Sequence, residues 1–406
     1  MKIFPNKKIL LITIVSGIVV VLGFFIIYLV VDDQLKIEKI DEIDYSKLPK
    51  DVSPEIYYSK QIFEKCEYDM HCVVELLTDL TRNNEKPLVM ATFTKIISLY
   101  HDKQVNSRCH SIAHHLGEWV YGYTKNLDES FKYADPFSCG GGLYHGIFEN
   151  YFSILNFEGA MADQVEVKHL CNGIEDNFYS LNMAHCLHGI GHGLLLLYDY
   201  DVFDAVKRCE EFATDPEQNS CANGVFMQNV LKNFETDDGQ FDDEDILFPC
   251  NEINSTFTPT CYIWQGPYIL KKHDFEVYSS FRECDKITQE FIKYCYYGIG
   301  AELESDAAGK MELAWRFCQA GEKSDYHKYC FRGMAMKTSM VYLDSGFKFC
   351  SLVPEQSKEE CYDGLGYWIK LRHDSDEERK RECSKAENTQ YFEICMNSKI
   401  EKISYL

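Results

Sequence analysis

Eight of the thirteen histidines lie between residues 110 and 192, and six of these eight lie in three similar segments. The segments are CHSIAHHLGEWVYG from Cys109, CGGGLYHGIFENYF from Cys139 and CLHGIGHGLLLLY from Cys186. The sixth residue after each of these cysteines is a histidine: His115, His145 and His192. An imidazole at the same position of three consecutive repeats indicates a site that the repeated architecture assembles.

Residues four apart share one face of a helix, and several of these histidines have that spacing. A helix can then offer two ligands to one cation. Neighbouring helices pack about 8–10 Å apart, so imidazoles on two helices can reach one ion. One ion, two ions, or one ion with an outer histidine are all compatible with this pattern. The predicted metal ligands are His110, His114, His115, His145, His188 and His192.

A set of histidines with one carboxylate suits a transition metal such as zinc, iron or copper. If one coordination position stays open, a bound water could be the nucleophile of a hydrolase, with Glu118 or Glu149 as the base. A redox-active ion would instead give an oxidase. The sequence leaves enzyme activity open. The competing interpretation, a histidine that only satisfies its neighbours, is applied to the rest of the chain: His71, His101, His169, His273, His327 and His373.

The elements that must position these residues follow from the cysteines. After residue 171 the cysteines form pairs separated by ten or eleven residues, with one longer first loop, and the second members recur about every 34 residues. Apolar helical runs flank each pair, which predicts an all-α array of two-helix hairpins, curved into a solenoid or closed into a toroid. The predicted disulfides are Cys171–Cys186, Cys209–Cys221, Cys250–Cys261, Cys284–Cys295, Cys318–Cys330, Cys350–Cys361 and Cys383–Cys395.

The first four cysteines allow three connectivities, of which Cys66–Cys72 with Cys109–Cys139 is preferred because the first bridge is local and the second joins neighbouring repeat units. A glycine recurs three residues after the second cysteine of most pairs. Glycine costs about 1 kcal/mol against alanine in a helix, so this position needs a reason. Close approach between neighbouring helices is the preferred reason; room for a ligand near Gly140-Gly141-Gly142 is the alternative.

Eighteen cysteines without a C-x-x-C knuckle indicate disulfides and an oxidising compartment. Residues 9–31 carry no charge and follow three lysines, which predicts a transmembrane signal anchor with the tail 1–8 in the cytoplasm. A cleaved signal peptide is the alternative, but no small-residue cleavage site follows the apolar run. The expected organisation is therefore the tail, the anchor, a juxtamembrane linker at 32–55 and an extracytoplasmic repeat domain at 56–406, in a single-pass protein of the cell membrane.

The net charge of −23 repels phosphate backbones, so no nucleic-acid partner is expected. The partner beyond the membrane is an unidentified protein, peptide or small molecule. A second hypothesis is a non-catalytic scaffold that binds a protein or peptide at the cell surface. The general plan is similar to that of cysteine-rich Sel1-type repeat proteins, although the cysteine spacing is longer and the G-x-G-V turn is missing. The similarity is one of architecture and assigns no family.

Overall fold

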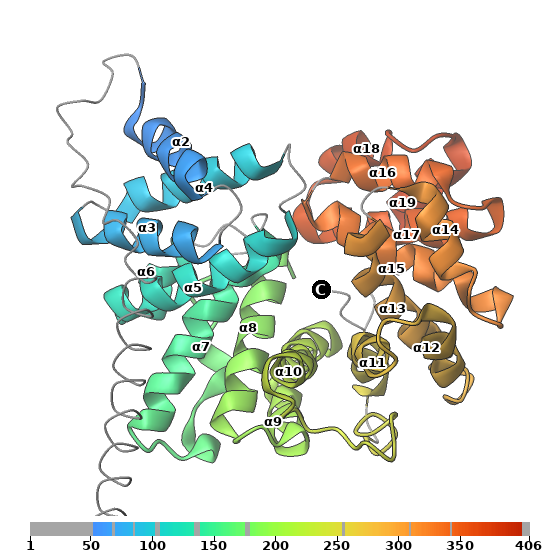
Figure 1. The fold of residues 1–406 in the computed structure, drawn as a ribbon, viewed down its shortest axis with the longest axis horizontal. Helices are drawn as coiled ribbons and strands as arrows, with labels where there is room; N and C mark the ends of the chain where they lie inside the picture. Colours follow the sequence, from blue (N-terminus) through green and yellow to red (C-terminus); the bar gives the residue numbers. More distant parts are fainter. Residues whose placement is uncertain are drawn as a thin grey trace, which may run out of the picture. The chain divides into compact units, whose positions relative to one another are not determined.

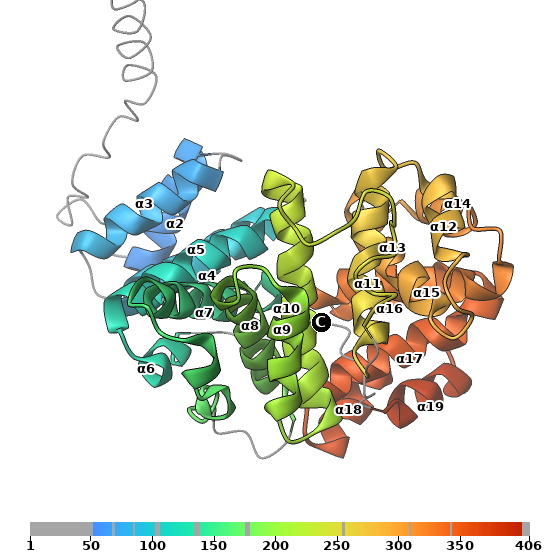
Figure 2. The same cartoon turned by 90° about the horizontal axis from the view of Figure 1, so that it is seen from below.

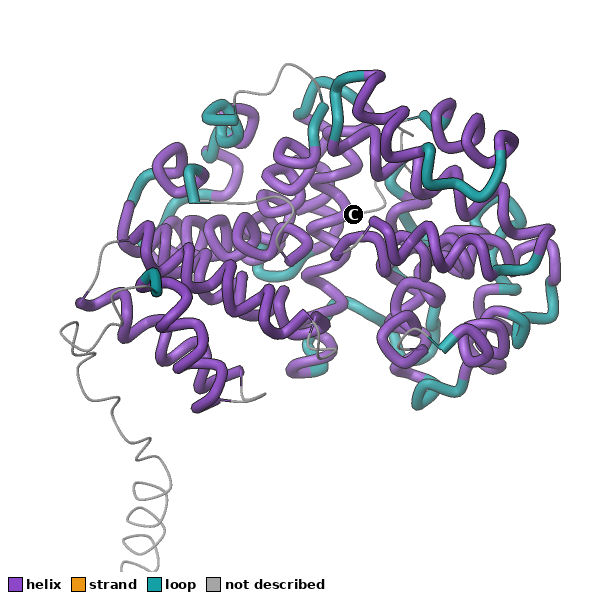
Figure 3. Tube along the Cα trace, turned by 90° about the horizontal axis from the view of Figure 1, so that it is seen from above, coloured by secondary structure: helices purple, strands orange, loops and turns teal. Residues whose placement is uncertain are grey.

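The structure of the chain is a computed structural model. It describes residues 52–66, 70–83, 86–101, 106–133, 139–174, 179–253, 256–307, 310–341 and 343–399. These residues form helices and loops and contain no strand (Figure 3). The predicted tail and anchor, and most of the predicted linker, lie outside the described residues. Among the helices that are described, none is both long and apolar enough to cross a membrane.

The described residues from 58 onward form one compact unit. In this unit long helices pack against one another in chain order (Figures 1 and 2). They are α5 (Asn106–Thr124), α7 (Gly142–Phe157), α8 (Leu181–Leu197), α10 (Asp215–Thr236), α11 (Thr258–Lys272), α13 (Ile292–Ala307), α15 (His327–Val341), α17 (Glu355–Arg372) and α19 (Thr389–Asn397).

Shorter helices alternate with the long ones and pack beside them. They are α6 (Leu127–Phe131), α9 (Val202–Arg208), α12 (Val277–Cys284), α14 (Met311–Cys318), α16 (Leu343–Leu352) and α18 (Asp376–Cys383). Before this array come α2 (Pro54–Cys66), α3 (Met70–Asn83) and α4 (Lys86–His101). The all-α class and the sequential pairing of helices are thereby confirmed. Two hairpins differ from the expectation. Between α7 and Cys171 only the 3-10 turns η3 (Ala162–Gln164) and η4 (Val167–His169) are present. No helix stands between α10 and Cys250, where the sequence is the acidic stretch ETDDGQFDDED.

Eight disulfides are present among the described cysteines. They include Cys66–Cys72 and all seven pairs predicted from the spacing. In three hairpins the first cysteine is the last residue of the short helix, at Cys284, Cys318 and Cys383. Each such bridge closes a loop of about a dozen residues, which stabilises the fold by roughly 2–3 kcal/mol in the chain-entropy account. The predicted Cys109–Cys139 pair involves side chains that lie outside the described set.

The recurrent glycines mark close approach between neighbouring long helices, as preferred from the sequence. A Cβ built on Gly224 of α10 would lie 1.9 Å from the carbonyl oxygen of His188 in α8. A Cβ on Gly298 would lie 1.8 Å from the carbonyl oxygen of Ile263. Real Cβ atoms do not approach so closely, and only glycine lets these backbones touch. These contacts therefore fix the axial register of each helix relative to its neighbour.

The row of long helices does not run straight. The 3-10 turn η2 (Cys139–Gly141), which leads into α7, contacts α15 near the other end of the row. A Cβ on Gly140 would lie 2.8 Å from Cε of Met340. Gly140 and Gly141 both have positive φ angles, 57° and 74°, which turn the chain into α7 in a conformation that favours glycine. Because the row of long helices curves, helices from distant repeats face one cavity.

Candidate metal centre

Three consecutive long helices carry the histidine cluster. Each contributes two side chains spaced four residues apart, which therefore lie on the same face. Helix α8 begins where the Ser180 side chain accepts a hydrogen bond from the backbone N–H of Met183. Glycines at the helix crossings bring the three backbones together. The residues are His110 and His114 on α5, His145 and Glu149 on α7, and His188 and His192 on α8.

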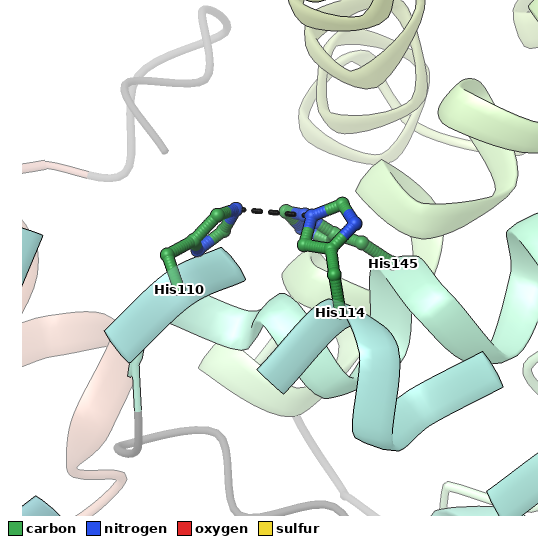
Figure 4. Close-up of side chains that lie close together, drawn as sticks. All are labelled: His110, His114 and His145. Atoms are coloured by element: carbon green, nitrogen blue, oxygen red, sulfur yellow. Dashed lines mark hydrogen bonds between the residues drawn. The ribbon is translucent and has the colours of Figure 1, made fainter. Parts of the chain in front are cut away.

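The first group of nitrogens joins α5 to α7. His110, His114 and His145 point toward one another (Figure 4). Nε2 of His114 lies 3.2 Å from Nε2 of His110 and 3.0 Å from Nδ1 of His145. The nitrogens of two histidines bound tetrahedrally to one zinc ion lie roughly 3.3 Å apart. The spacing of these three nitrogens is thus close to that of a metal-bound triad.

The second group joins α7 to α8 and is buried throughout. It consists of His145, His188 and His192, each of which offers a nitrogen within 4.8 Å of the others. Nε2 of His192 lies 3.0 Å from Nε2 of His188. The ring of His145 stacks on both, with centroid distances of 4.5 and 4.4 Å. The side chain of His145 therefore belongs to both groups.

Glu149 contacts one histidine of each group. Its Oε2 lies 3.2 Å from Nδ1 of His114, and its Oε1 lies 3.4 Å from Nδ1 of His192. Burial alone would raise the pKa of the Glu149 carboxyl. The charge of His114 and hydrogen bonds from both rings outweigh burial, and the pKa lies well below its ordinary value. A carboxylate can only accept, so both Nδ1 atoms carry the hydrogen, and in the neutral form of each ring Nε2 keeps the lone pair.

The buried rings are held neutral. Burial, followed by the charges of neighbouring histidines, moves the pKa of His145 and of His188 well below 6.5. The pKa of His192 is also lowered by burial, although Glu149 opposes the change. A metal ion binds only the unprotonated imidazole. The rings are thus in the protonation state that a metal requires.

Two buried nitrogens of the cluster have no hydrogen-bond partner among the residues that the structure describes. They are Nε2 of His145 and Nδ1 of His188, on side chains that are only 2% exposed. Leaving a buried polar atom unpaired costs about 1–3 kcal/mol, and such atoms are uncommon in folded proteins. A bound cation at Nε2 of His145 would remove that cost. The donor set and its unpaired atom therefore fit a transition metal.

A cavity of about 80 Å³ opens beside the cluster. Histidines line one side, and apolar side chains from α10, α11, α13 and α15 line the rest, with two charged residues at the wall. The sixth position after the cysteine faces this cavity in five repeats: His145, Met227, Pro267, Ala301 and Met336. The shared position found in the sequence thus describes the lining of one inner site.

His115 does not join the cluster. Its side chain is 56% exposed, and its Nδ1 lies 3.6 Å from Oε2 of Glu118, which is itself 44% exposed. In three repeats the recurrent glycine approaches the backbone carbonyl of the neighbouring long helix at the second residue after that helix's cysteine; these glycines are Gly224, Gly298 and Gly333. Gly142 instead approaches the carbonyl of His110, the first residue after Cys109. Helix α5 is therefore shifted by one residue relative to that pattern. With this shift, His114 and not His115 occupies the repeat position that corresponds to His145.

Three residues at the site were not predicted as ligands or partners. Gln228 Oε1 lies 2.6 Å from Nδ1 of His192, Met227 Sδ lies 3.3 Å from Nε2 of His188, and His185 lines the cavity. Met227 stands at the sixth position of its repeat, and that position was the available signal. A prediction that considers only histidine at the sixth position omits Met227. Nothing comparable distinguishes Gln228 or His185 in the sequence.

Most of the aromatic residues that follow the second cysteines are buried. Tyr296, Tyr367 and Trp368 are at most 1% exposed, and Tyr262 and Tyr297 are 4% exposed. They pack in the core, and Trp264 and Tyr297 reach the wall of the cavity. The scaffold hypothesis therefore gains no support from these side chains.

Comparisons with known proteins assign no relative. No protein-family model matches the chain, and no significant similarity to a curated protein or to a solved structure was found. The eight disulfides indicate an extracytoplasmic protein in an oxidising compartment. The class that fold and site define is an extracytoplasmic helical-repeat protein with buried histidine groups that could hold a metal ion.

Proposed function

We propose that this protein binds one transition-metal ion at the histidine cluster of α5, α7 and α8 and presents it to a ligand in the adjoining cavity. The observation that carries the proposal is the buried Nε2 of His145, which has no hydrogen-bond partner in the described part of the chain although it lies among other imidazoles. Because His145 belongs to both groups and a neutral imidazole has one lone pair, the two groups are alternative places for a single ion.

The cavity gives the ion access to a small ligand. His110, His145, His185 and His188 line both the cluster and the cavity. The opposite wall is largely apolar, but it includes Glu302 and Lys337, which can orient a polar end of the ligand. A metal-bound water in such a place supports hydrolysis, and a redox metal supports oxidation of the ligand. In either reaction Glu149 orients His114 and His192, while Glu118 contacts the exposed His115.

The array and its compartment complete the proposal. The contact between η2 and α15 supports a strongly curved arrangement of the repeats, with the cavity on its inner side. Residues 9–31 anchor the chain in the cell membrane and residues 1–8 remain in the cytoplasm, because the apolar segment is long enough and the lysines precede it. The ligand then comes from outside the cytoplasm.

Metal analysis of the full chain tests the proposal. The protein is produced in an oxidising compartment without a histidine tag, and is then reconstituted separately with zinc, copper and iron. We expect roughly one tightly held ion per chain. His145→Ala should abolish this occupancy. His327→Ala is the matched control, since Nε2 of His327 already contacts the carbonyl oxygen of Gly321 at 2.7 Å. Less than about a tenth of an equivalent of every metal would refute the proposal.

A further inference from the structure

The hydrogen positions around Glu149 determine which nitrogens are free to bind an ion. His114 and His192 direct Nδ1–H toward this carboxylate, so their Nε2 atoms keep lone pairs. Nδ1 of His145 lies 3.0 Å from Nε2 of His114, and must therefore be the donor of that hydrogen bond. The lone pair of His145 is then on Nε2, the buried atom that no described group pairs. Glu149 and Oε1 of Gln228 thus fix the ring of His192, and Glu149 fixes the ring of His145 through His114.

A sulfur atom lies beside the same group. Nε2 of His188 is 3.0 Å from Nε2 of His192 and 3.3 Å from Sδ of Met227. A thioether has no hydrogen to donate, and Nε2 of His192 holds a lone pair. Nitrogen and sulfur ligands of one tetrahedral ion, at about 2.0 and 2.3 Å from it, lie roughly 3.5 Å from each other. The distance from the sulfur to Nε2 of His188 is therefore close to that between two ligands of one ion.

We infer that the ion is copper(I), bound by Nε2 of His145, His188 and His192 and by Sδ of Met227. This inference rests on the metal binding of the proposed function and names its metal; the four protein ligands take the coordination position that a metal-bound water would need. Thioether sulfur is a soft ligand that selects copper(I) and contributes little to hard or borderline divalent ions. His110 and His114 then form the outer layer of the site, with His114 relaying the orientation imposed by Glu149.

The surroundings favour a monovalent ion. The four ligand atoms belong to neutral groups, and the cavity beside them is lined by Met336 and Met340 as well as Met227. The cost of transferring an ion into a medium of low polarity rises with the square of its charge, so a divalent ion is much more costly there. The single negative charge of Glu149 balances one positive charge. A copper(I) ion therefore matches both the ligand set and the local charge.

Competition titrations of the full chain test this inference. Copper(I) affinity is measured against a chromophoric copper(I) chelator with ascorbate present, and zinc affinity is measured against a zinc chelator. Met227→Leu keeps the side-chain volume nearly unchanged. It should weaken copper(I) binding by at least about tenfold, which corresponds to about 1.4 kcal/mol, and leave zinc binding within about twofold. Met336→Leu, at the same repeat position, is the matched control and should change neither affinity.

X-ray absorption at the copper edge gives an independent readout. The wild-type protein should show one sulfur scatterer at about 2.3 Å, and Met227→Leu should lack it. Equal weakening of copper(I) and zinc in this variant, or a spectrum without sulfur, would overturn the assignment of Met227. A wild-type protein that prefers zinc would overturn copper(I) while the proposed metal site stands. Failure to bind any metal would overturn both.

Discussion

The carboxylate of Glu149 on α7 faces Nδ1 of His114 on α5 at 3.2 Å, although the two residues are thirty-five positions apart. The same carboxylate reaches Nδ1 of His192 on α8. Glu149 on the middle helix thereby sets the tautomer of His114, and together with Oε1 of Gln228 it sets that of His192. Outer partners of this kind orient the ligands of metal sites and raise their basicity.

Glu149→Gln should weaken metal binding about 10–100-fold without removing any ligand. The amide keeps the shape of the side chain but loses the charge, so it no longer requires Nδ1–H of His114, whereas Oε1 of Gln228 still accepts from Nδ1–H of His192. Metal affinity is measured by chelator competition on the full chain. Glu118→Gln is the control, because that carboxylate contacts the exposed His115. Equal weakening by both substitutions would contradict the role of Glu149.

His115→Ala should leave metal occupancy unchanged, whereas His192→Ala should lower it to less than about a tenth of the wild-type value. The reason is the one-residue shift of α5, which leaves His115 56% exposed while His192 is fully buried. Metal content after dialysis provides the measurement for both variants. Loss of metal from His115→Ala would show that α5 is not shifted in this way and that His115 is a ligand.

The hairpin repeat could be predicted because its signals are local. Each cysteine pair closes a short loop, and the apolar helical runs lie directly beside it, so seven disulfides followed from spacing alone. The identity of the three clustered helices also followed, because each carries histidines. The register of α5 relative to α7 could not be predicted. That register is set by contacts such as Gly146 against the carbonyl oxygen of His114, which no local pattern encodes.

The contacts of Gln228 and Met227 with the cluster could not be predicted from the sequence for the same reason. Gln228 and Met227 belong to α10, which packs on α8 through Gly191 and Gly224. Their contacts with His192 and His188 join residues thirty-six and thirty-nine positions apart. A sequence shows that a methionine occupies the sixth position of a repeat, but only the packing shows that its sulfur faces an imidazole. Helix register, and not helix location, is therefore the information that the structure adds.

Gly224→Ala should destabilise the protein by about 1–3 kcal/mol and also weaken metal binding. The added Cβ would lie 1.9 Å from the carbonyl oxygen of His188, so α8 must move together with its two histidines. Gly364→Ala is the matched control at the same repeat position. Its Cβ would meet only side-chain atoms of Arg332 and Met336, at 3.1 Å and beyond.

Thermal unfolding and metal titration of both glycine variants check this prediction. The expected order of stability is wild type, then Gly364→Ala, then Gly224→Ala. Only the last should lose metal affinity. If the two variants were equally stable, the close approach at Gly224 would not be what limits the position of α8.

Peptide mapping under non-reducing conditions should link Cys109 to Cys139. Cys66–Cys72 and the seven repeat disulfides occupy all the other cysteines, and these two flank neighbouring helices of the cluster. The measurement is the mass of the linked peptide and its disappearance on reduction. Free thiols at both positions would contradict the pairing and leave η2 attached to α5 only by packing.

The metal-free protein should lose stability as the pH falls from 7.5 to 5.5. In the folded protein the pKa values of His145, His188 and His192 lie below 6.5, so the unfolded chain binds protons that the folded chain does not. The contribution of these rings is therefore complete above pH 6.5 and is lost below it, by roughly 1 kcal/mol per ring per pH unit. Glu149, whose pKa is also lowered, acts in the same direction but only below about pH 4.5.

Thermal midpoints across this pH range, measured with a chelator present, provide the check. His188→Gln should reduce the pH dependence because the buried ring is absent, although the variant is less stable at pH 7.5. His115→Ala should keep the full dependence, since its exposed ring lies outside the buried cluster. A midpoint that stays constant or rises as the pH falls would mean that the cluster accepts protons in the folded state. Such a cluster would not hold its nitrogens ready for an ion.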